Sequence, residues 1–575
     1  MPQKKKKNYP PGRKPPRGHR DPPHLNILKE ALAHHLAQDF DRALAAYDRA
    51  IAMQPDFAVT HSGRGSVLQA AGRFEDALAA FDRAITLDPV YADAHYHRGD
   101  LLQKSGKYAE ALAAFDRAIA LKPDVASAHN DRAAVLHALG KHEEAQTAWR
   151  RAIALKPAYA EAHYNQGLAL RQAGRYEEAL AALDRAIALK PTYINAHFNR
   201  GLALKQAGRH EEAVSAFDQT IALKPDFAEA HFNRGFSLQE LTRYEEALRT
   251  YDKALALKTD YPAVLWNKSL LLLLRGDFAE GWRLYEWRHA VMKQFVRPLQ
   301  QPLLSLDRED PKGRTVLLYA EQGLGDTIQM LRYVPLLAAR GFRIIVEVPA
   351  SLLTLSCGLS GVALLVPHGK TLPDFDLQCP FMSLPLVFKT TVETIPSATP
   401  YLKAPPDKKA FWQDRLGVKT RPRIGLVWSG SHQHENDRER SIPLATLLPL
   451  LNRNAEFYSL QKEYRQTDTE ALMLHQKRLR DYSKELDDFG DTAALIDEMD
   501  LVISVDTAAA HLACALGKPV WILLPYAVDF RWFTDREDSP WYPTARLFRQ
   551  PAFHAWKPVV EKLDDLLKNY LLPKP

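Results

Sequence analysis

A 34-residue period runs through the first half of the chain and restricts its fold more than any other feature. Prolines recur at this step, each closing a phrase such as Asp-Arg-Ala-Ile-Ala-Leu-Lys-Pro, at Pro55, Pro89, Pro123, Pro157, Pro191 and Pro225. Alanine, glycine and aromatic residues keep the same step. Since small residues let helices approach and aromatic side chains fill between them, the period predicts stacked helical pairs.

The order of residues within each unit gives a more specific reading. Gly or Ala, then Ala, an aromatic residue, Ala and Pro resembles the tetratricopeptide repeat, whose paired antiparallel helices stack into a superhelical solenoid. In one unit we expect helices over 160–173 and 176–189, with Gly174 and Arg175 turning between them. Seven such units are expected over residues 24–261.

The next segment, residues 262–312, reads as an atypical eighth repeat and a junction. It keeps part of the repeat pattern and then loses the period. Three tryptophans, Trp266, Trp282 and Trp287, lie close together in this segment. Because clustered large aromatic side chains are usually buried, they predict a packed interface with the following domain.

Asparagine recurs at one helix position in four successive units, as Asn165, Asn199, Asn233 and Asn267. An amide donates and accepts hydrogen bonds, so a row of amides suits the backbone of an extended peptide. A similar ladder lines the repeat domain of O-linked N-acetylglucosamine transferases. The alternative is that each asparagine only contacts its own neighbouring turn. The four residues are our predicted site for a protein or peptide partner.

From about Arg314 the pattern changes to short apolar runs that alternate with helical stretches. The runs are 316–319, 344–348, 363–366, 424–428, 501–505 and 520–524. They read as strands of parallel sheets, which are buried on both faces. A proline-rich segment near 394–407 divides this region, so we expect two Rossmann-like halves with a cleft, over 313–405 and 406–575.

Two strand ends carry polar motifs. The first strand is followed by Glu-Gln-Gly-Leu-Gly-Asp, which contains Gly323, Gly325 and Asp326. Another strand runs into Asp506, Thr507, Ala508 and His511, where Thr507 can cap the following helix and leave its first amides free for a phosphate. Both motifs lie where parallel α/β sheets bind ligands, beyond the carboxyl ends of the strands.

These motifs resemble the heptosyltransferase-like glycosyltransferases of family 9 over roughly residues 313–558. Gly-Leu-Gly-Asp, Arg440-Ser441-Ile442-Pro443 after Trp428-Ser429-Gly430, and Asp-Thr-x-x-x-His-Leu-Ala occur in the family's order. The resemblance implies a GT-B fold, with the nucleotide sugar bound mainly by the second half. It implies that Asp326 is the general base on the acceptor and that Arg440 neutralises the diphosphate. The implied donor-binding set is Gly323, Gly325, Ser429, Glu463, Asp506, Thr507, Ala508 and His511.

The sequence therefore predicts a multidomain chain, an all-α repeat solenoid followed by an α/β GT-B-like module. The expected activity is transfer of a sugar from a nucleotide-sugar donor to a hydroxyl acceptor, inverting and without a metal or other cofactor. The acceptor is a protein held by the repeats or a glycan. The alternative is a repeat scaffold whose GT-B module is inactive or senses a nucleotide.

Charge and cysteine content narrow the remaining classes. The net charge of +7 is carried by a tail, residues 1–23, that is rich in Pro, Lys and Arg and is expected to be disordered. The rest of the chain is balanced, so we expect no nucleic-acid partner. The 3 cysteines have no metal-ligand spacing. With no apolar run long enough for a membrane span and no signal peptide, we expect a cytoplasmic protein.

Overall fold

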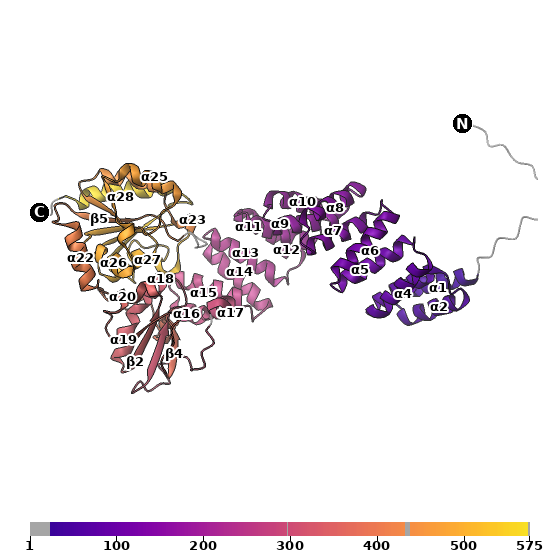
Figure 1. Ribbon diagram of the computed structural model, residues 1–575, viewed down its shortest axis with the longest axis horizontal. Helices are drawn as coiled ribbons and strands as arrows, with labels where there is room; N and C mark the ends of the chain where they lie inside the picture. Colours follow the sequence, from indigo (N-terminus) through magenta and orange to yellow (C-terminus); the bar gives the residue numbers. More distant parts are fainter. Residues whose placement is uncertain (1–22, 296, 432–436, 573–575) are drawn as a thin grey trace, which may run out of the picture. The chain divides into compact units, whose positions relative to one another are not determined.

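In a computed structural model, residues 23–295, 297–431 and 437–572 are described (Figure 1). The predicted basic tail lies outside these residues except for Pro23, the first residue of helix α1. Contacts divide the chain into two compact units, residues 1–225 and residues 226–575. Each unit is a folded body of its own kind, the first helical and the second mixed.

The first unit consists of antiparallel helical pairs along its described length. The helices are α1 (Pro23–Leu36), α2 (Phe40–Met53), α3 (Ala58–Ala70), α4 (Phe74–Leu87), α5 (Ala92–Lys104), α6 (Tyr108–Leu121), α7 (Ala126–Ala138), α8 (His142–Leu155), α9 (Ala160–Gln172), α10 (Tyr176–Leu189), α11 (Ile194–Gln206) and α12 (His210–Leu223). The bounds of α9 and α10 confirm the helices predicted for that unit.

The recurring glycines explain how each pair closes. Gly201 on α11 faces the ring of Phe217 on α12 so closely that an added Cβ would lie 2.6 Å from a ring carbon. A second glycine ends the first helix of most pairs, as Gly208 does with φ +76°, a conformation that costs a residue without a Cβ little. The predicted roles of small residue and aromatic filler are both confirmed.

The recurring histidines have a local structural role. His163 and His197 contact, through Nε2, the carbonyl oxygens of Pro157 and Pro191, at 3.2 Å and 2.9 Å. The proline carbonyl at the end of one repeat thereby gains a partner from the first helix of the next. This contact explains why histidine and proline share the 34-residue step.

The second unit begins with helices that continue the repeat pattern. They are α13 (Ala228–Glu240), α14 (Tyr244–Leu257), α15 (Pro262–Arg275), α16 (Phe278–Tyr285) and α17 (Arg288–Val291). The leucine run at the end of α15 is buried from Leu271 to Leu274. A helix that is apolar on all sides needs neighbours on all sides, and here α14, α16, α17 and the α/β module provide them.

The first α/β half contains one parallel sheet in the order β3-β2-β1-β4. Its strands are β1 (Thr315–Tyr319), β2 (Arg343–Val348), β3 (Val362–Pro367) and β4 (Leu377–Pro380). Its helices are α18 (Leu324–Met330), α19 (Val334–Ala339), α20 (Leu353–Ser356) and α21 (Leu384–Val387). The helical stretch that follows the Asp326 motif is not continuous. The 3-10 turn Leu331–Tyr333 separates α18 from α19, because Pro335 has no N–H to continue the ladder.

The second half contains a six-stranded parallel sheet in the order β10-β9-β8-β5-β6-β7. Its strands are β5 (Arg423–Val427), β6 (Glu456–Ser459), β7 (Leu479–Asp481), β8 (Leu501–Val505), β9 (Val520–Leu524) and β10 (Ala545–Arg549). Its helices are α22 (Pro406–Leu416), α23 (Asp437–Arg440), α24 (Leu444–Leu447), α25 (Gln466–His475), α26 (Phe489–Asp497), α27 (Ala508–Ala515) and α28 (Trp556–Tyr570). Counted from β5, the order is 3-2-1-4-5-6, the dinucleotide-fold topology. The predicted fold class is confirmed.

Candidate functional site

Each sheet has a point at which the strand order reverses, and both points bear the predicted motifs. In the second half the reversal lies between β5 and β8, which are followed by Ser429 and by Asp506. In the first half it lies between β1 and β4, and the loop after β1 leads to Asp326. Chain crossovers leave on opposite sides at such points, which opens a binding position at the carboxyl ends of the strands.

The two motifs meet directly where α18 packs against α27, a contact region that we call the seam. A Cβ on Gly325 would lie 2.9 Å from Cδ2 of His511 and 3.5 Å from Cα of Ala508. Only a glycine allows this approach between the two helices. The second motif glycine, Gly325, therefore allows the two halves to come together.

Asp326 lies at the seam with both carboxylate oxygens engaged. Its Oδ2 accepts a hydrogen bond of 2.9 Å from the amide of Gly323, which caps the first turn of α18. Its Oδ1 is paired with the guanidinium of Arg531, which comes from the second half. The side chain of Asp326 keeps 23% of its surface exposed, so a substrate hydroxyl can reach its remaining lone pairs.

Asp506 lies at the tip of β8 among charged and aromatic side chains. Burial, and to a lesser extent the nearby carboxylate of Asp529, raises the pKa of Asp506 to about 6. Trp532, Arg440 and Arg531 act in the opposite direction, since each favours the charged carboxylate. Asp506 therefore titrates within reach of neutral pH, which is common at functional sites.

His511 is buried on α27, one turn beyond Thr507. Its Nδ1 lies 2.9 Å from the hydroxyl of Tyr542, and its ring stacks on Trp532 with centroids 5.3 Å apart. Its Nε2 lies 3.7 Å from the carboxylate of Asp506. Burial lowers the pKa of His511 well below its ordinary value, and Arg531 and Arg332 lower it further. The imidazole is therefore neutral near pH 7.

The start of α27 is arranged to receive an anion. The hydroxyl of Thr507 accepts from the amide of Ala510, as the sequence predicted for a helix cap, and Ala508 lies half-buried in the first turn. Arg440, at the end of α23, donates to the backbone carbonyl of Asp506 over 3.1 Å. A fixed cation and the positive end of a helix thus lie side by side.

Two other predicted donor-binding residues differ in their accessibility. Ser429 is buried, and its hydroxyl and carbonyl accept hydrogen bonds of 2.9 Å and 2.8 Å from the amide of Gln461. This contact ties the end of β5 to the end of β6. Glu463 follows β6 and is exposed. The structure places Ser429 inside the loop framework and leaves Glu463 open to a ligand.

The segment after β9 supplies the residues that our predicted site lacked. Arg531 and Trp532 form a short 3-10 turn, Phe530–Trp532, and both side chains are buried against the seam. Tyr542 contacts His511. The dense charges and aromatics in this segment were visible in the sequence, but their link to Asp326 was not, since 205 residues separate Arg531 from it.

The junction helices pack on this same segment. Phe278 of α16 stacks on Phe533 with centroids 6.0 Å apart, and Trp282 meets Phe530 edge to face at 5.7 Å. Trp282 therefore confirms the predicted interface with the next domain. Trp266 and Trp287 are only half-buried.

The junction also holds the loop that leads to Asp326. Arg288, which is 1% exposed, pairs with Glu321 at 2.7 Å, and Tyr285 donates to the side chain of Gln322 over 3.1 Å. A buried cation needs such partners, because leaving it unpaired would be costly. The repeat-like helices are thus part of the framework of the α/β site.

The asparagine ladder has partners within the protein. Asn199, Asn233 and Asn267 each donate to the carbonyl oxygen four residues earlier in their own helix, at 2.9, 2.8 and 2.8 Å. Asn165 instead donates to the side chain of Asn130 at 3.1 Å. The contact with the neighbouring turn therefore exists for three of the four, and peptide binding by this row stays a prediction.

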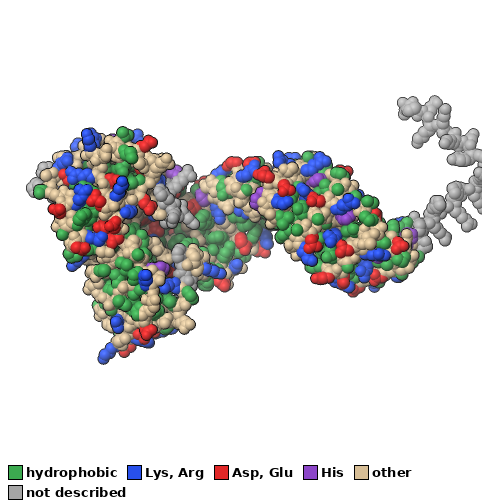
Figure 2. Space-filling model, in the orientation of Figure 1, with side chains coloured by type: hydrophobic (Ala, Val, Ile, Leu, Met, Phe, Trp, Pro, Cys, Tyr) green, Lys and Arg blue, Asp and Glu red, His purple; other side chains and the backbone are tan. Residues whose placement is uncertain are grey.

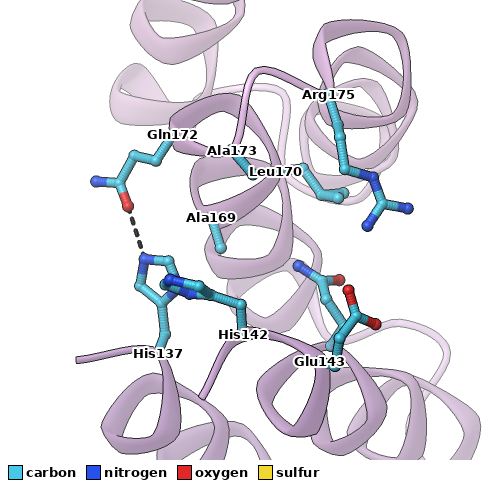
Figure 3. Close-up of a pocket in the computed structure, with 9 residues that line it drawn as sticks. His137, His142, Glu143, Ala169, Leu170, Gln172, Ala173 and Arg175 are labelled. Atoms are coloured by element: carbon cyan, nitrogen blue, oxygen red, sulfur yellow. Dashed lines mark hydrogen bonds between the residues drawn. The ribbon is translucent and has the colours of Figure 1, made fainter. Parts of the chain in front are cut away.

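A pocket of about 390 Å³ lies among helices α7 to α10 of the first unit (Figure 3). His137 and His142 lie together at one side, and Nε2 of His137 contacts Gln172 at 2.7 Å. Arg175 is paired with Glu178 outside the pocket. His137, His142 and Arg175 of this pocket therefore already have protein partners.

Three further features of the described residues concern surface charge, clusters of metal-binding side chains and helix length. Figure 2 shows Lys and Arg interspersed with Asp and Glu over the visible face, without a field of one sign. Among the described residues, no group of three His, Cys, Asp or Glu side chains is placed to hold a metal ion. No helix in the described part of the chain is long and apolar enough to cross a membrane.

Comparison with known families finds matches in both parts of the chain. One family model, TPR repeat, matches residues 133–170 and 167–208. A second family model, Tetratricopeptide repeat, matches residues 28–92, 62–126, 96–145 and 198–262. The model of Glycosyltransferase family 9 (heptosyltransferase) matches residues 486–527. This last match contains β8 and the start of α27, and with them Asp506, Thr507 and His511.

Individual proteins are similar over parts of the chain. Protein FlbA of Caulobacter vibrioides is 25% identical over 326 residues, which are 52% of this chain and 54% of FlbA. The chain thus spans about half the length of this relative. The structure of YrrB, a TPR protein with an unusual peptide-binding site, is 27% identical, with a TM-score of 0.30 over 33% of this chain and 98% of YrrB. The structure of MamA is 27% identical, with a TM-score of 0.27 over 28% of this chain and 94% of MamA.

The repeat matches cover the helical pairs, and the family 9 match lies on the strand-to-helix turn at the reversal point of the larger sheet. These findings support a glycosyltransferase with a repeat region. Residues 28–262 therefore contain tetratricopeptide repeats, and the GT-B-like α/β module contains a segment, residues 486–527, that is similar to glycosyltransferase family 9.

Proposed function

We propose that this protein transfers a sugar from a nucleotide-sugar donor to a hydroxyl acceptor, with the donor held by the second α/β half. The observation that carries the proposal is the position of the family 9 segment. In that segment, Asp506 and the start of α27 lie at the reversal point of a dinucleotide-type sheet, where α27 packs on Gly325, the neighbour of Asp326 in the other half. Donor and acceptor groups can therefore meet at the seam.

The donor diphosphate would lie at the start of α27, where helix amides and Arg440 offer positive charge. This charge stabilises the leaving nucleoside diphosphate as the sugar–phosphate bond breaks. Arg440 and the helix end supply what a divalent ion supplies elsewhere, so the proposed reaction uses no metal. Asp506 would accept hydrogen bonds from hydroxyls of the donor, and Glu463 would reach its ribose.

The acceptor hydroxyl would lose its proton to Asp326 as its oxygen attacks the anomeric carbon. A positioned carboxylate contributes about 10²- to 10⁴-fold as a general base. Attack from the face opposite the leaving diphosphate gives direct displacement with inversion. The proton stays on Asp326 until it exchanges with solvent, and the leaving group departs with the electron pair of the broken bond.

A panel of ADP-, UDP-, GDP- and dTDP-sugars tests the donor site through thermal unfolding of the full chain. A donor at 100 times its dissociation constant adds about 2.7 kcal/mol of stability. We expect one donor to stabilise the wild-type protein and to lose this effect in Asp506→Asn and in Arg440→Ala. Asp535→Asn, which changes an exposed carboxylate in the same half, is the matched control. Stabilisation that survives both site substitutions would refute the donor site.

For the repeats we propose a protein acceptor or partner, held along the row that contains Asn165, Asn199, Asn233 and Asn267. Binding of acidic, basic and neutral unfolded polypeptides to the full chain tests this proposal. Replacing the four residues by alanine should weaken binding, whereas Asn195→Ala, an exposed position of α11, should not. Equal affinities of the wild-type protein and the four-alanine variant would contradict the proposed row and leave a glycan as the acceptor to test.

One observation favours a second function, a repeat scaffold whose GT-B module binds a nucleotide without turnover. Both carboxylate oxygens of Asp326 already have donors in the protein, Gly323 and Arg531. Each of these contacts occupies a lone pair that an acceptor proton would otherwise use. Donor stabilisation without release of nucleoside diphosphate, whatever acceptor is supplied, would identify this second function.

A further inference from the structure

Arg531 occupies an unusual position, because each of its guanidinium nitrogens has a different partner. Nη2 is paired with Oδ1 of Asp326, Nε donates to Oε1 of Gln329 at 2.7 Å, and Nη1 donates to Oδ1 of Asp529 at 2.7 Å. The residue is 7% exposed. Two of the partners belong to α18 of the first half, so the guanidinium crosses the seam.

Only a planar guanidinium satisfies these three partners at once. Arginine presents five N–H donors in a fixed fork, whereas lysine offers one ammonium on a flexible stem. A buried cation in this position also needs all its partners, because its loss of hydration must be compensated. The three contacts therefore fix the position of Arg531 and, through it, that of Asp326.

The turn that carries Arg531 is itself held in a costly conformation. Phe533 has φ +55° and ψ −177°, a region that is occupied almost only by glycine. Arg549 donates to the carbonyl oxygens of Trp532 and Phe533, at 2.5 Å and 3.1 Å. The ring of Phe533 stacks on Phe278 of the junction. Such strain persists where the surroundings impose it, and here it directs Arg531 to the seam.

We propose that Arg531 is a positioning residue for sugar transfer, which holds the Asp326 carboxylate oriented toward the acceptor hydroxyl and ties it to the donor half. This proposal rests on the proposed function, in which Asp326 is the base. With Oδ2 on the Gly323 amide and Oδ1 on Arg531, the plane of the carboxylate is fixed. The acceptor proton then moves to a lone pair of known direction, and Arg531 itself does not contact the substrate.

The test compares Arg531→Ala and Arg531→Lys with Arg536→Ala, which removes a half-exposed arginine of the same segment paired with Asp538. The assay is release of nucleoside diphosphate from the donor found by thermal unfolding. We expect kcat to fall about 10²-fold or more in both Arg531 variants, with KM for the donor within about threefold of wild type, because misplacement by about 1 Å costs this much. Arg536→Ala should leave both constants unchanged.

Added guanidinium sharpens the test. We expect millimolar guanidinium to raise kcat of Arg531→Ala severalfold, because the ion can occupy the vacated position, and to leave Asp326→Asn unaffected. Wild-type kcat in Arg531→Lys with an unchanged unfolding curve would overturn the proposal. If Asp326→Asn also keeps full turnover, the proposed base fails; if only the Arg531 variants keep it, the positioning role fails alone.

Hydrogen exchange tests the positioning role of Arg531 without a substrate or an activity measurement. The Gly323 amide is protected by Asp326, so loosening of that carboxylate should speed exchange of the segment 322–326 in Arg531→Lys but not in Arg536→Ala. Should Arg531→Ala fail to fold, Arg531→Lys carries both measurements. Unchanged exchange in a folded Arg531→Lys protein would contradict the proposal.

Discussion

Contacts within the repeats join residues that are close in sequence, whereas contacts within the α/β module join residues that are far apart. In the repeats, ion pairs link residues 16 positions apart in successive helices, as Arg98 with Asp82 and Arg200 with Asp184 do. At the seam, Arg531 meets Asp326 across 205 positions, and Arg332 meets Trp541 across 209. Loss of a contact within the repeats should therefore destabilise only its own repeat. Loss of a contact at the seam should displace residues of the whole candidate site. Four predictions test this contrast, from the largest expected effect to the smallest.

Phe278→Ala should produce the largest loss of stability. Phe278 is 2% exposed and packs against Phe533, Trp541 and Trp282, so its loss leaves a cavity where the junction meets the module. Truncation of a buried phenylalanine costs about 3–5 kcal/mol. Denaturant unfolding measures the change, and Phe74→Ala, at a position 44% exposed on α4, is the control. Equal losses for the two variants would contradict the importance of the junction.

Asp506→Asn should stabilise the protein at neutral pH while removing a donor contact. The folded pKa of about 6 lies above the ordinary value of 3.8, so the native state resists ionisation between these values. The wild-type protein is therefore relatively most stable below pH 4 and loses stability as the pH rises through about 6. The shift corresponds to about 3 kcal/mol at most.

Denaturant unfolding of Asp506→Asn and wild type between pH 4 and pH 8 measures this difference. We expect no advantage of the variant near pH 4, a growing advantage up to about pH 6 and a constant one above it. The exposed Asp535→Asn substitution should show no such curve. An advantage that shrinks as the pH rises would have the wrong sign for a carboxyl group with a raised pKa.

Gly201→Ala should have a smaller effect that is confined to the repeats. The added methyl group would meet the ring of Phe217 at 2.6 Å, and overpacking of this kind costs about 1–3 kcal/mol. Thermal unfolding and hydrogen exchange should locate the loss in α11 and α12. Ser215→Ala, at an exposed position of α12, is the matched control. Loss of protection at the seam instead would show that the two regions are not separable in this way.

Arg98→Ala should have the smallest effect. Its pair with Asp82 is 2.7 Å long but half-exposed, and exposed pairs contribute about 0.2–1 kcal/mol. A double-mutant cycle with Asp82→Ala measures the coupling. A coupling above about 1.5 kcal/mol would mean that the periodic pairs form an extended network.

The same contrast explains what could be predicted from the sequence. The bounds of α9 and α10 and the strands β1, β2, β8 and β9 followed from local patterns, since each is encoded in a few consecutive residues. The strands β4, β7 and β10 were missed, because Leu377–Pro380 and Leu479–Asp481 are very short and Ala545–Arg549 contains the charged residues Arg546 and Arg549. The family motifs predicted Asp326 and Asp506 as site residues.

The partners of those residues could not be read in the same way. Arg531 was visible as one charge in an aromatic segment, but nothing in its neighbourhood specifies Gln329 or Asp326 as its partners. The contact of Gly325 with His511 likewise depends on how two sheets meet. Sequence patterns thus pointed to candidate functional groups, and only the fold shows which of them share an environment.

The junction also determines where this protein could be divided or recombined with others. Composition changes near Arg314, yet α15 to α17 contact the loops on both sides of the seam. A fragment that begins at the composition boundary would lack Phe278, Tyr285 and Arg288 and would expose the aromatic surface that they cover. Helical pairs could be added or lost only upstream of α13, because α14 covers part of the buried leucine run of α15. The breakpoint for exchange of solenoids therefore lies between the two compact units, after Pro225.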